Sequence, residues 1–181
     1  NFKVGVAIKP GKTINVRSGQ TIVVSNGLLT GGTNTLFNVQ DGGHLTLNNV
    51  TITGNTADDQ GAVCVQSGAL LDLGYNDKNP SITPQISGNT NGNDARNLVI
   101  AQDARVRLNT EPFQTIGVSY GEKMDTPVSI LFGGRYALQK SDINTGKIQP
   151  DNTENELVVY NDQIVLRYSK RQILLWDPTK T

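Results

Sequence analysis

Three aspartates in short polar loops could bind a cation or a sugar. Asp58 and Asp59 are adjacent in the segment TADDQG, and Asp77 lies in the segment GYNDKN. Carboxylate oxygens are preferred calcium ligands, and they also accept hydrogen bonds from hydroxyl groups. If both loops lie on one edge of the molecule, the sequence predicts a calcium or glycan site there. The alternative, which we prefer, is that these residues are solvated turn positions, because Asp and Asn are common in turns.

A fourth aspartate, Asp72, belongs to an apolar segment, and Tyr75 follows it closely. Through the repeat described below, we expect Asp72 to lie beside Arg107 and to form a lone surface ion pair with it, worth about 0–1 kcal/mol. The ring of Tyr75 could stack on a sugar. No cofactor is expected, and calcium at the loop aspartates is the one alternative. The candidate ligand-binding residues are therefore Asp58, Asp59, Asp72, Tyr75 and Asp77.

Residues for acid–base, nucleophilic or metal chemistry are scarce. His44 is the only histidine and Cys64 the only cysteine, so the sequence indicates no histidine-rich metal site, catalytic triad or intramolecular disulfide. Both side chains are expected to point outward without a catalytic partner. A polysaccharide hydrolase needs two carboxylates, and a lyase needs clustered acids with a base. The outward positions of the repeat hold mainly Asn, Thr and Ser, so no catalytic residue is predicted.

The composition excludes some partners and favours β structure. Sixteen basic and sixteen acidic residues give a net charge of zero, which indicates neither nucleic acid nor an anionic membrane as a partner. The sequence has no apolar run long enough to be inserted across a bilayer. Asn, Thr, Gly, Ser and Gln are abundant, and these residues favour turns and strands over helix interiors.

An internal repeat covers much of the chain. Four segments share an apolar pair at alternate positions, a turn and a second apolar pair: TINVRSGQTIVV, LFNVQDGGHLTL, AVCVQSGALLDL and NLVIAQDARVRL. Both pairs recur together after 23, then 26, then 35 residues. One turn position holds glycine three times and aspartate once, which indicates a left-handed backbone conformation. The residues at this position are Gly19, Gly42, Gly68 and Asp103.

A third short strand follows each segment, as in LLTGG, ITGNT and ISGNT. Three alternating strands per repeat are typical of a parallel β-helix, in which equivalent apolar residues stack coil over coil. We therefore predict an all-β fold: a right-handed parallel β-helix (solenoid) of about four three-stranded coils over residues 1–119. A C-terminal β-rich cap over residues 120–181 completes one structural unit. The alternative is an antiparallel sandwich.

The repeat is no longer recognisable after Val118. SILFGG and RYALQK are expected to be strands, followed by a turn or a short helix that begins at Ser141 or Asp142. ELVVYNDQIVLRYS predicts a β-hairpin, because apolar residues alternate on both sides of a polar turn. QILLW is expected as the last strand. Since a solenoid must cover its final coil, these elements are interpreted as a cap.

The segments GGHLTLNNVTITGNTADDQGAVCVQSGALLDL and DARNLVIAQDARVRL resemble the β-helix regions of large bacterial cell-surface adhesins. The segment ELVVYNDQIVLR resembles the end of such regions. The resemblance implies an extracellular location on the cell surface, as part of a larger protein, which also fits a chain that begins at Asn1. The present sequence departs from the adhesin family at GAVCV, where the family often has a run of glycines before the strand.

Adhesion is the function that this resemblance implies. The expected partner is a host or microbial surface glycan or protein, bound without catalysis. Two alternatives stay open: a polysaccharide lyase or hydrolase with its site at the insertion after Leu73, and a structural stalk that binds nothing. The sequence indicates no particular oligomeric state.

Overall fold

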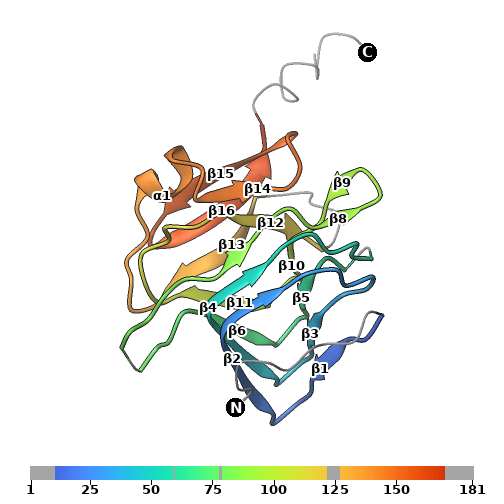
Figure 1. The fold of residues 1–181 in the computed structure, drawn as a ribbon. Helices are drawn as coiled ribbons and strands as arrows, with labels where there is room; N and C mark the ends of the chain where they lie inside the picture. The colour runs from blue at the N-terminus through green and yellow to red at the C-terminus, as the bar shows by residue number, and fades with distance from the viewer. Residues whose placement is uncertain (1–10, 59, 78, 122–126, 170–181) are drawn as a thin grey trace.

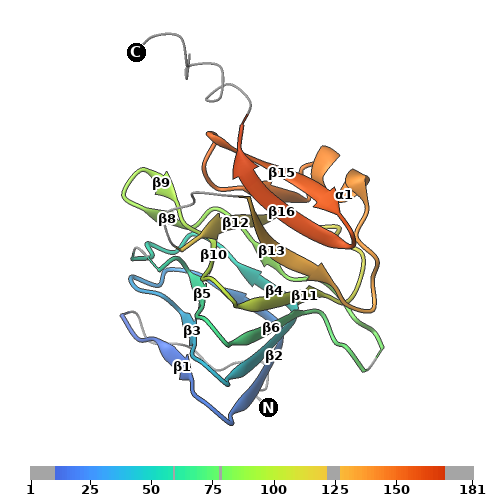
Figure 2. The same ribbon diagram turned by 180° about the vertical axis from the view of Figure 1, so that it is seen from behind.

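The computed structural model describes residues 11–58, 60–77, 79–121 and 127–169. The predicted all-β fold is confirmed: within these ranges fourteen strands form one large, mostly parallel sheet, and two more strands form a small hairpin. The strands are stacked in layers from the blue N-terminal end to the orange C-terminal end (Figure 1; seen from behind in Figure 2). The predominance of parallel pairing excludes the antiparallel sandwich.

The first parallel ladder contains the strands that carry the first apolar pair of each repeat. Ile14 lies opposite Phe37, Phe37 opposite Val63, and Val63 opposite Leu98. This is the register predicted from the repeat, and it is confirmed. The strands of this ladder are β1 (Ile14–Val16), β3 (Phe37–Val39), β5 (Val63–Val65), β10 (Leu98–Ile100) and β12 (Ile116–Tyr120).

The second ladder contains the strands of the second apolar pairs. Leu45 lies between Ile22 and Leu71, and Leu71 lies opposite Val106. The predicted register is confirmed here too. The strands are β2 (Thr21–Leu29), β4 (His44–Ile52), β6 (Leu70–Leu73), β11 (Arg105–Leu108) and β13 (Val128–Gly133).

The third ladder starts in the second halves of β2 and β4, which bend from one ladder into the next. Asn26 and Asn49 are at the bends with φ of 57° and 52°, and the side-chain amide of Asn49 donates to Oδ1 of Asn26 at 2.8 Å. Asparagine tolerates this left-handed conformation better than most residues. Ile52 then pairs with residues of β2 and of β7 (Gln85–Ile86), and Ile116 of β12 pairs with Ile86.

The apolar residues of the three ladders form one core. The side chains of Phe37, Leu45, Leu71 and Ile86 are fully buried, because alternate residues of each strand point to the inside. The predicted left-handed turn is confirmed as well. Its φ angles are 74°, 67°, 73° and 59° at Gly19, Gly42, Gly68 and Asp103.

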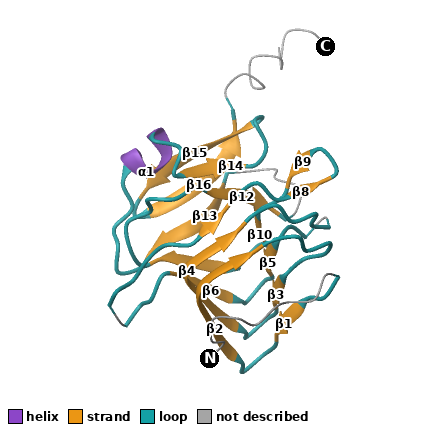
Figure 3. Ribbon diagram, in the orientation of Figure 1, coloured by secondary structure: helices purple, strands orange, loops and turns teal. Residues whose placement is uncertain are grey.

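Two segments extend beyond the ladders between β5 and β10. The predicted surface loop joins β6 to β7 and is drawn in teal on the left of Figure 3. The second segment is a hairpin that was not predicted, formed by the antiparallel strands β8 (Thr90–Asn91) and β9 (Asp94–Ala95). This hairpin lies on the opposite side of the molecule from the loop (Figure 3).

The expectation that the repeat ends at Val118 is wrong. Leu98 pairs with Val118 in the first ladder, β13 continues the second ladder beside β11, and β14 (Ile148–Pro150) continues the third beside β12. A fifth layer therefore follows the four that were predicted. It was missed because residues 134–147 separate its strands and β14 contributes one apolar residue, Ile148, to the core.

A β-hairpin closes the C-terminal end of the sheet. β15 (Asn155–Tyr160) and β16 (Gln163–Tyr168) are antiparallel, as predicted, and β16 pairs with β13. The turn residues Asn161 and Asp162 have φ of 49° and 55°, the conformation that a two-residue hairpin turn requires.

The segment between β13 and β14 is partly helical. α1 (Lys140–Asn144) begins one or two residues before the predicted start at Ser141 or Asp142, and the carboxylate of Asp142 accepts a hydrogen bond from the backbone of Gln139 at 2.8 Å. RYALQK is not a strand, in contrast to the prediction, because side chains bind the backbone N–H groups that a sheet would need. The N–H of Leu138 donates to Asp162 at 2.8 Å. QILLW lies outside the described residues.

Candidate functional site

Asp72 is at the centre of a polar cluster on the outer face of the second ladder. Arg107 donates to it twice, from Nε to Oδ1 at 2.8 Å and from Nη2 to Oδ2 at 2.7 Å. Asn109 donates to Oδ1 at 3.0 Å, and Nε2 of His44 lies 2.7 Å from Oδ2. The predicted pair of Asp72 and Arg107 is present, but it is neither lone nor exposed: Asp72 is 1% exposed.

The cluster holds Asp72 as a carboxylate. Burial alone would raise the pKa of Asp72, but hydrogen bonds from His44, Arg107 and Asn109 outweigh it and lower the pKa to about 2. A carboxylate only accepts hydrogen bonds, so Nε2 of His44 is the donor in its hydrogen bond with Oδ2 of Asp72. The four hydrogen bonds occupy both oxygens of Asp72, and the arrangement stabilises the stack rather than offering a ligand site.

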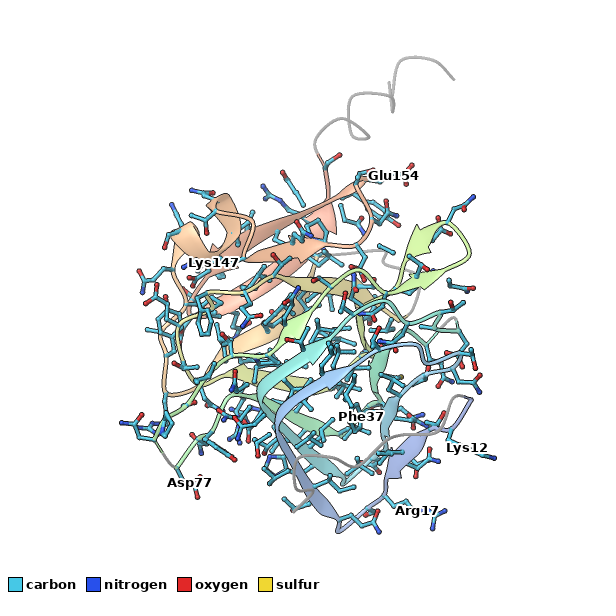
Figure 4. The ribbon with its side chains drawn as sticks, viewed as in Figure 1. Lys12, Arg17, Phe37, Asp77, Lys147 and Glu154 are labelled. Atoms are coloured by element: carbon cyan, nitrogen blue, oxygen red, sulfur yellow. The ribbon has the colours of Figure 1, made fainter. Side chains whose placement is uncertain are left out.

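The loop aspartates are not brought together. Asp58 lies in the connection from β4 to β5 and accepts hydrogen bonds from Thr35 Oγ1 and from the backbone of Gln60. Asp77 is exposed at the tip of the β6–β7 loop, at the lower left of Figure 4, whereas β3 and β5 lie on the right of Figure 1. The hypothesis of one shared edge is therefore wrong. Asp59 lies outside the described residues.

Tyr75 lies at the base of the same loop as Asp77. Its side chain is half-buried, and its backbone carbonyl accepts a hydrogen bond from Ser81 at 3.1 Å. Within residues 11–58, 60–77, 79–121 and 127–169, no three His, Cys, Asp or Glu side chains are grouped as metal ligands would be. Calcium binding by the aspartate loops stays a prediction without structural support.

Cys64 points away from the core, yet it is only 8% exposed. Burial, with a smaller contribution from Asp58, raises the pKa of its thiol to about 11. Because the thiolate is the nucleophilic form, Cys64 is suited to packing rather than to chemistry.

A cleft lies away from these residues, at the C-terminal end of the described chain. It has a volume of about 740 Å³ and lies between the β8–β9 hairpin, the end of β12, the 151–155 turn and the end of β16. Glu154 marks the turn, beside the hairpin, in Figure 4. Sequence reasoning missed this cleft because its walls come from four separate segments between Asn93 and Tyr168, with no shared motif. One signal was present in the sequence: Tyr120, whose aromatic ring could stack on a sugar.

One wall of the cleft continues a row of polar side chains, which we call the asparagine row: the buried Asn55, Asn89 and Asn97 and the half-buried Asp151. Each asparagine donates from its side-chain amide to the next residue of the row, at 2.7 Å, 2.9 Å and 2.6 Å. The three asparagines are at most 3% exposed. The row crosses the layers and ends at Asp151, in the cleft wall.

Asp151 connects the 151–155 turn to the sheet. Its Oδ2 accepts hydrogen bonds from the backbone of Asn97 at 2.9 Å and from Ser119 Oγ at 2.7 Å, while its own N–H donates to Val118 at 2.8 Å. Several hydrogen bonds to one carboxylate fix its position. The turn that bears Glu154 is therefore held firmly against β10 and β12.

The cleft offers mixed polar and aromatic chemistry. Asp94, Arg96 and Glu154 supply charged groups, and Tyr120 and Tyr168 supply aromatic rings. Tyr168 is 38% exposed. Such a surface can hydrogen-bond a polar ligand while an aromatic ring covers one of its faces.

Comparisons of the chain with known protein families, with curated proteins and with solved structures give no match. None of the helical residues that the structure describes belongs to a helix long and apolar enough to cross a membrane. The described residues define the class of the molecule as all-β with a large, mostly parallel sheet.

Proposed function

We propose that the chain is a parallel β-helix segment of an extracellular bacterial adhesin and that its C-terminal cleft binds a surface glycan without catalysis. The observation that carries this proposal is the cleft itself, which combines tyrosines with carboxylate, amide and hydroxyl groups. Sugar hydroxyls donate and accept hydrogen bonds, so they match such a mixed lining.

Three parallel ladders in matched register support the β-helix. Each ladder repeats through the same layers, and the chain passes from the first to the second to the third ladder before it returns. Parallel crossover connections are almost always right-handed, which supports the predicted hand. The resemblance of the repeats to adhesin β-helix regions supports a place on the cell surface.

The polar cluster at Asp72 supports a non-catalytic function for the second ladder. Its carboxylate is buried and fully hydrogen-bonded, so it has no oxygen left to bind calcium or to accept a substrate proton. The buried Cys64 thiol is equally unsuited to attack a substrate.

One observation favours the polysaccharide-cleaving alternative. Asp94 and Glu154 are both exposed in the same cleft, and glycoside hydrolysis uses two carboxylates. Incubation of the chain with neutral and acidic polysaccharides, with and without calcium, decides between the two functions. New reducing or unsaturated ends that are lost in Asp94→Asn or Glu154→Gln would establish an enzyme, and no release supports binding alone.

Glycan arrays and a panel of immobilised host surface proteins test the proposal. We expect glycan binding that falls at least about tenfold in Tyr168→Ala, because a sugar ring loses its stacking partner. Tyr160→Ala is the matched control, since Tyr160 is 66% exposed on the same hairpin and does not line the cleft. Binding to proteins but to no glycan would show that the partner is a protein and would overturn the glycan proposal. No binding in either assay would support the structural stalk instead.

A further inference from the structure

We infer that the cleft selects uncharged, hydroxyl-rich glycans and rejects glycans that carry carboxylate or sulfate groups. The inference rests on the proposed function and names the ligand class of the same site. It follows from three properties of the cleft: its charge, its unpaired polar atoms and its rigidity.

The charge of the described lining is negative. Three carboxylates, Asp94, Asp151 and Glu154, face a single cation, Arg96. Asp94 and Glu154 are exposed on two different elements of the lining, the β8–β9 hairpin and the 151–155 turn. An anionic sugar in the cleft meets like charge on both elements, and like-charge contacts at an interface suppress binding of the wrong partner. A neutral sugar meets no such repulsion, and its hydroxyl groups can donate to these carboxylates.

The walls also contain a donor and an acceptor that have no partner within the protein. Nε of Arg96 and Oδ1 of Asn155 are both buried and make no hydrogen bond. Such groups are rare in folded proteins, and each needs an explanation. A hydroxyl group can accept from a guanidinium and donate to an amide oxygen, so small rotations of these two side chains let sugar hydroxyls satisfy both.

The rigidity of the cleft favours selection. Four hydrogen bonds hold Asp151 in place. Its carboxylate accepts three from Asn97 and Ser119, and its backbone N–H donates the fourth to Val118. The carboxylates of the 151–155 turn therefore cannot move away easily from an anionic ligand, and a preorganised site loses little entropy on binding a neutral one.

Calorimetric titration of the intact chain with matched sugars tests the inference. The probes are neutral glycans that bind the chain on the glycan array. Each is paired with its uronate, sulfated or sialylated counterpart. We expect each charged counterpart to bind at least about tenfold more weakly than the neutral glycan. In the double variant Asp94→Asn with Glu154→Gln this discrimination shrinks. The control is Asp41→Asn with Asp77→Asn, which makes the same change of net charge at exposed positions outside the cleft lining and keeps the discrimination.

Two failures of this experiment are distinguishable. If a charged counterpart binds as tightly as the neutral glycan or more tightly, the inference is overturned while glycan binding stands. If no neutral or charged glycan binds, both the inference and the proposed function are overturned.

Discussion

Asn97 and Asp151 are 54 residues apart in the chain, yet the side-chain amide of Asn97 donates to Oδ1 of Asp151 at 2.6 Å. The backbone N–H of Asn97 donates to the other oxygen at 2.9 Å. This residue pair thus joins the buried asparagines of the row to the turn that forms one wall of the cleft.

Replacing Asn97 tests whether this pair stabilises the fold. Asn97→Ala leaves buried polar groups of Asn89 and Asp151 without partners, and each such group costs about 1–3 kcal/mol. We expect the free energy of unfolding in urea to fall by about 2–4 kcal/mol. Asn76→Ala, at an exposed position of the β6–β7 loop, is the control and should change it by less than about 0.5 kcal/mol. Equal effects of the two variants would contradict a structural role for the row.

The hydrogen-bonded Asp72 predicts a specific dependence of stability on pH. Its pKa in the folded chain is about 2, below its ordinary value near 3.9, so the unfolded chain binds the proton more readily. The stabilisation is therefore present above about pH 4 and is lost as the pH falls toward 2, by about 2 kcal/mol.

Urea unfolding of the wild type and of Asp72→Asn at several pH values measures this loss. The wild type should be the more stable at pH 6, and the difference between the two proteins should shrink steadily below pH 4. A difference that does not vary with pH would show that Asp72 is not ionised and paired as the structure has it.

The apolar stack predicts unequal effects of two leucine truncations. Leu71 is fully buried between Leu45 and Val106, whereas Leu28 is 63% exposed. Leu71→Ala should lower the free energy of unfolding by about 2–5 kcal/mol, because it leaves a cavity. Leu28→Ala should change it by less than about 1 kcal/mol. Denaturant titration of both variants measures the contrast, and a Leu28→Ala effect as large as that of Leu71→Ala would argue against the layer assignment.

The buried cysteine predicts slow alkylation. With a thiol pKa of about 11 and 8% exposure, Cys64 should react with iodoacetamide at pH 8 at least about a hundredfold more slowly in the folded chain than in urea. Mass spectrometry of the quenched reaction gives both rates. Similar rates in the two states would mean that Cys64 is accessible and that β5 is not packed as described.

Much of the fold could be predicted from the sequence because stacked layers repeat a local pattern. The pairing of Val63 with Leu98 follows from apolar residues at equal positions in successive repeats. The fifth layer was not predictable in this way, since Ile148 is the one residue of β14 that continues the third ladder in the core.

The sites were harder to predict than the ladders. The sequence put Asp72 beside Arg107, but its burial depends also on His44 and Asn109, which approach from other positions of the layers. The cleft depends on Asp94, Asp151 and Tyr168, whose proximity is a result of the whole stack. No local pattern encodes such a proximity.

A nuclear magnetic resonance titration with the tightest-binding glycan tests the central claim most directly. The chain, at 19.5 kDa, is small enough for backbone amide signals to be followed residue by residue. The claim predicts shifts at the cleft residues Asp94, Ser119, Asp151, Glu154 and Tyr168, and unchanged signals at Asp72 and Asp77. Shifts concentrated around Asp72 or on the β6–β7 loop, with the cleft unaffected, would contradict it.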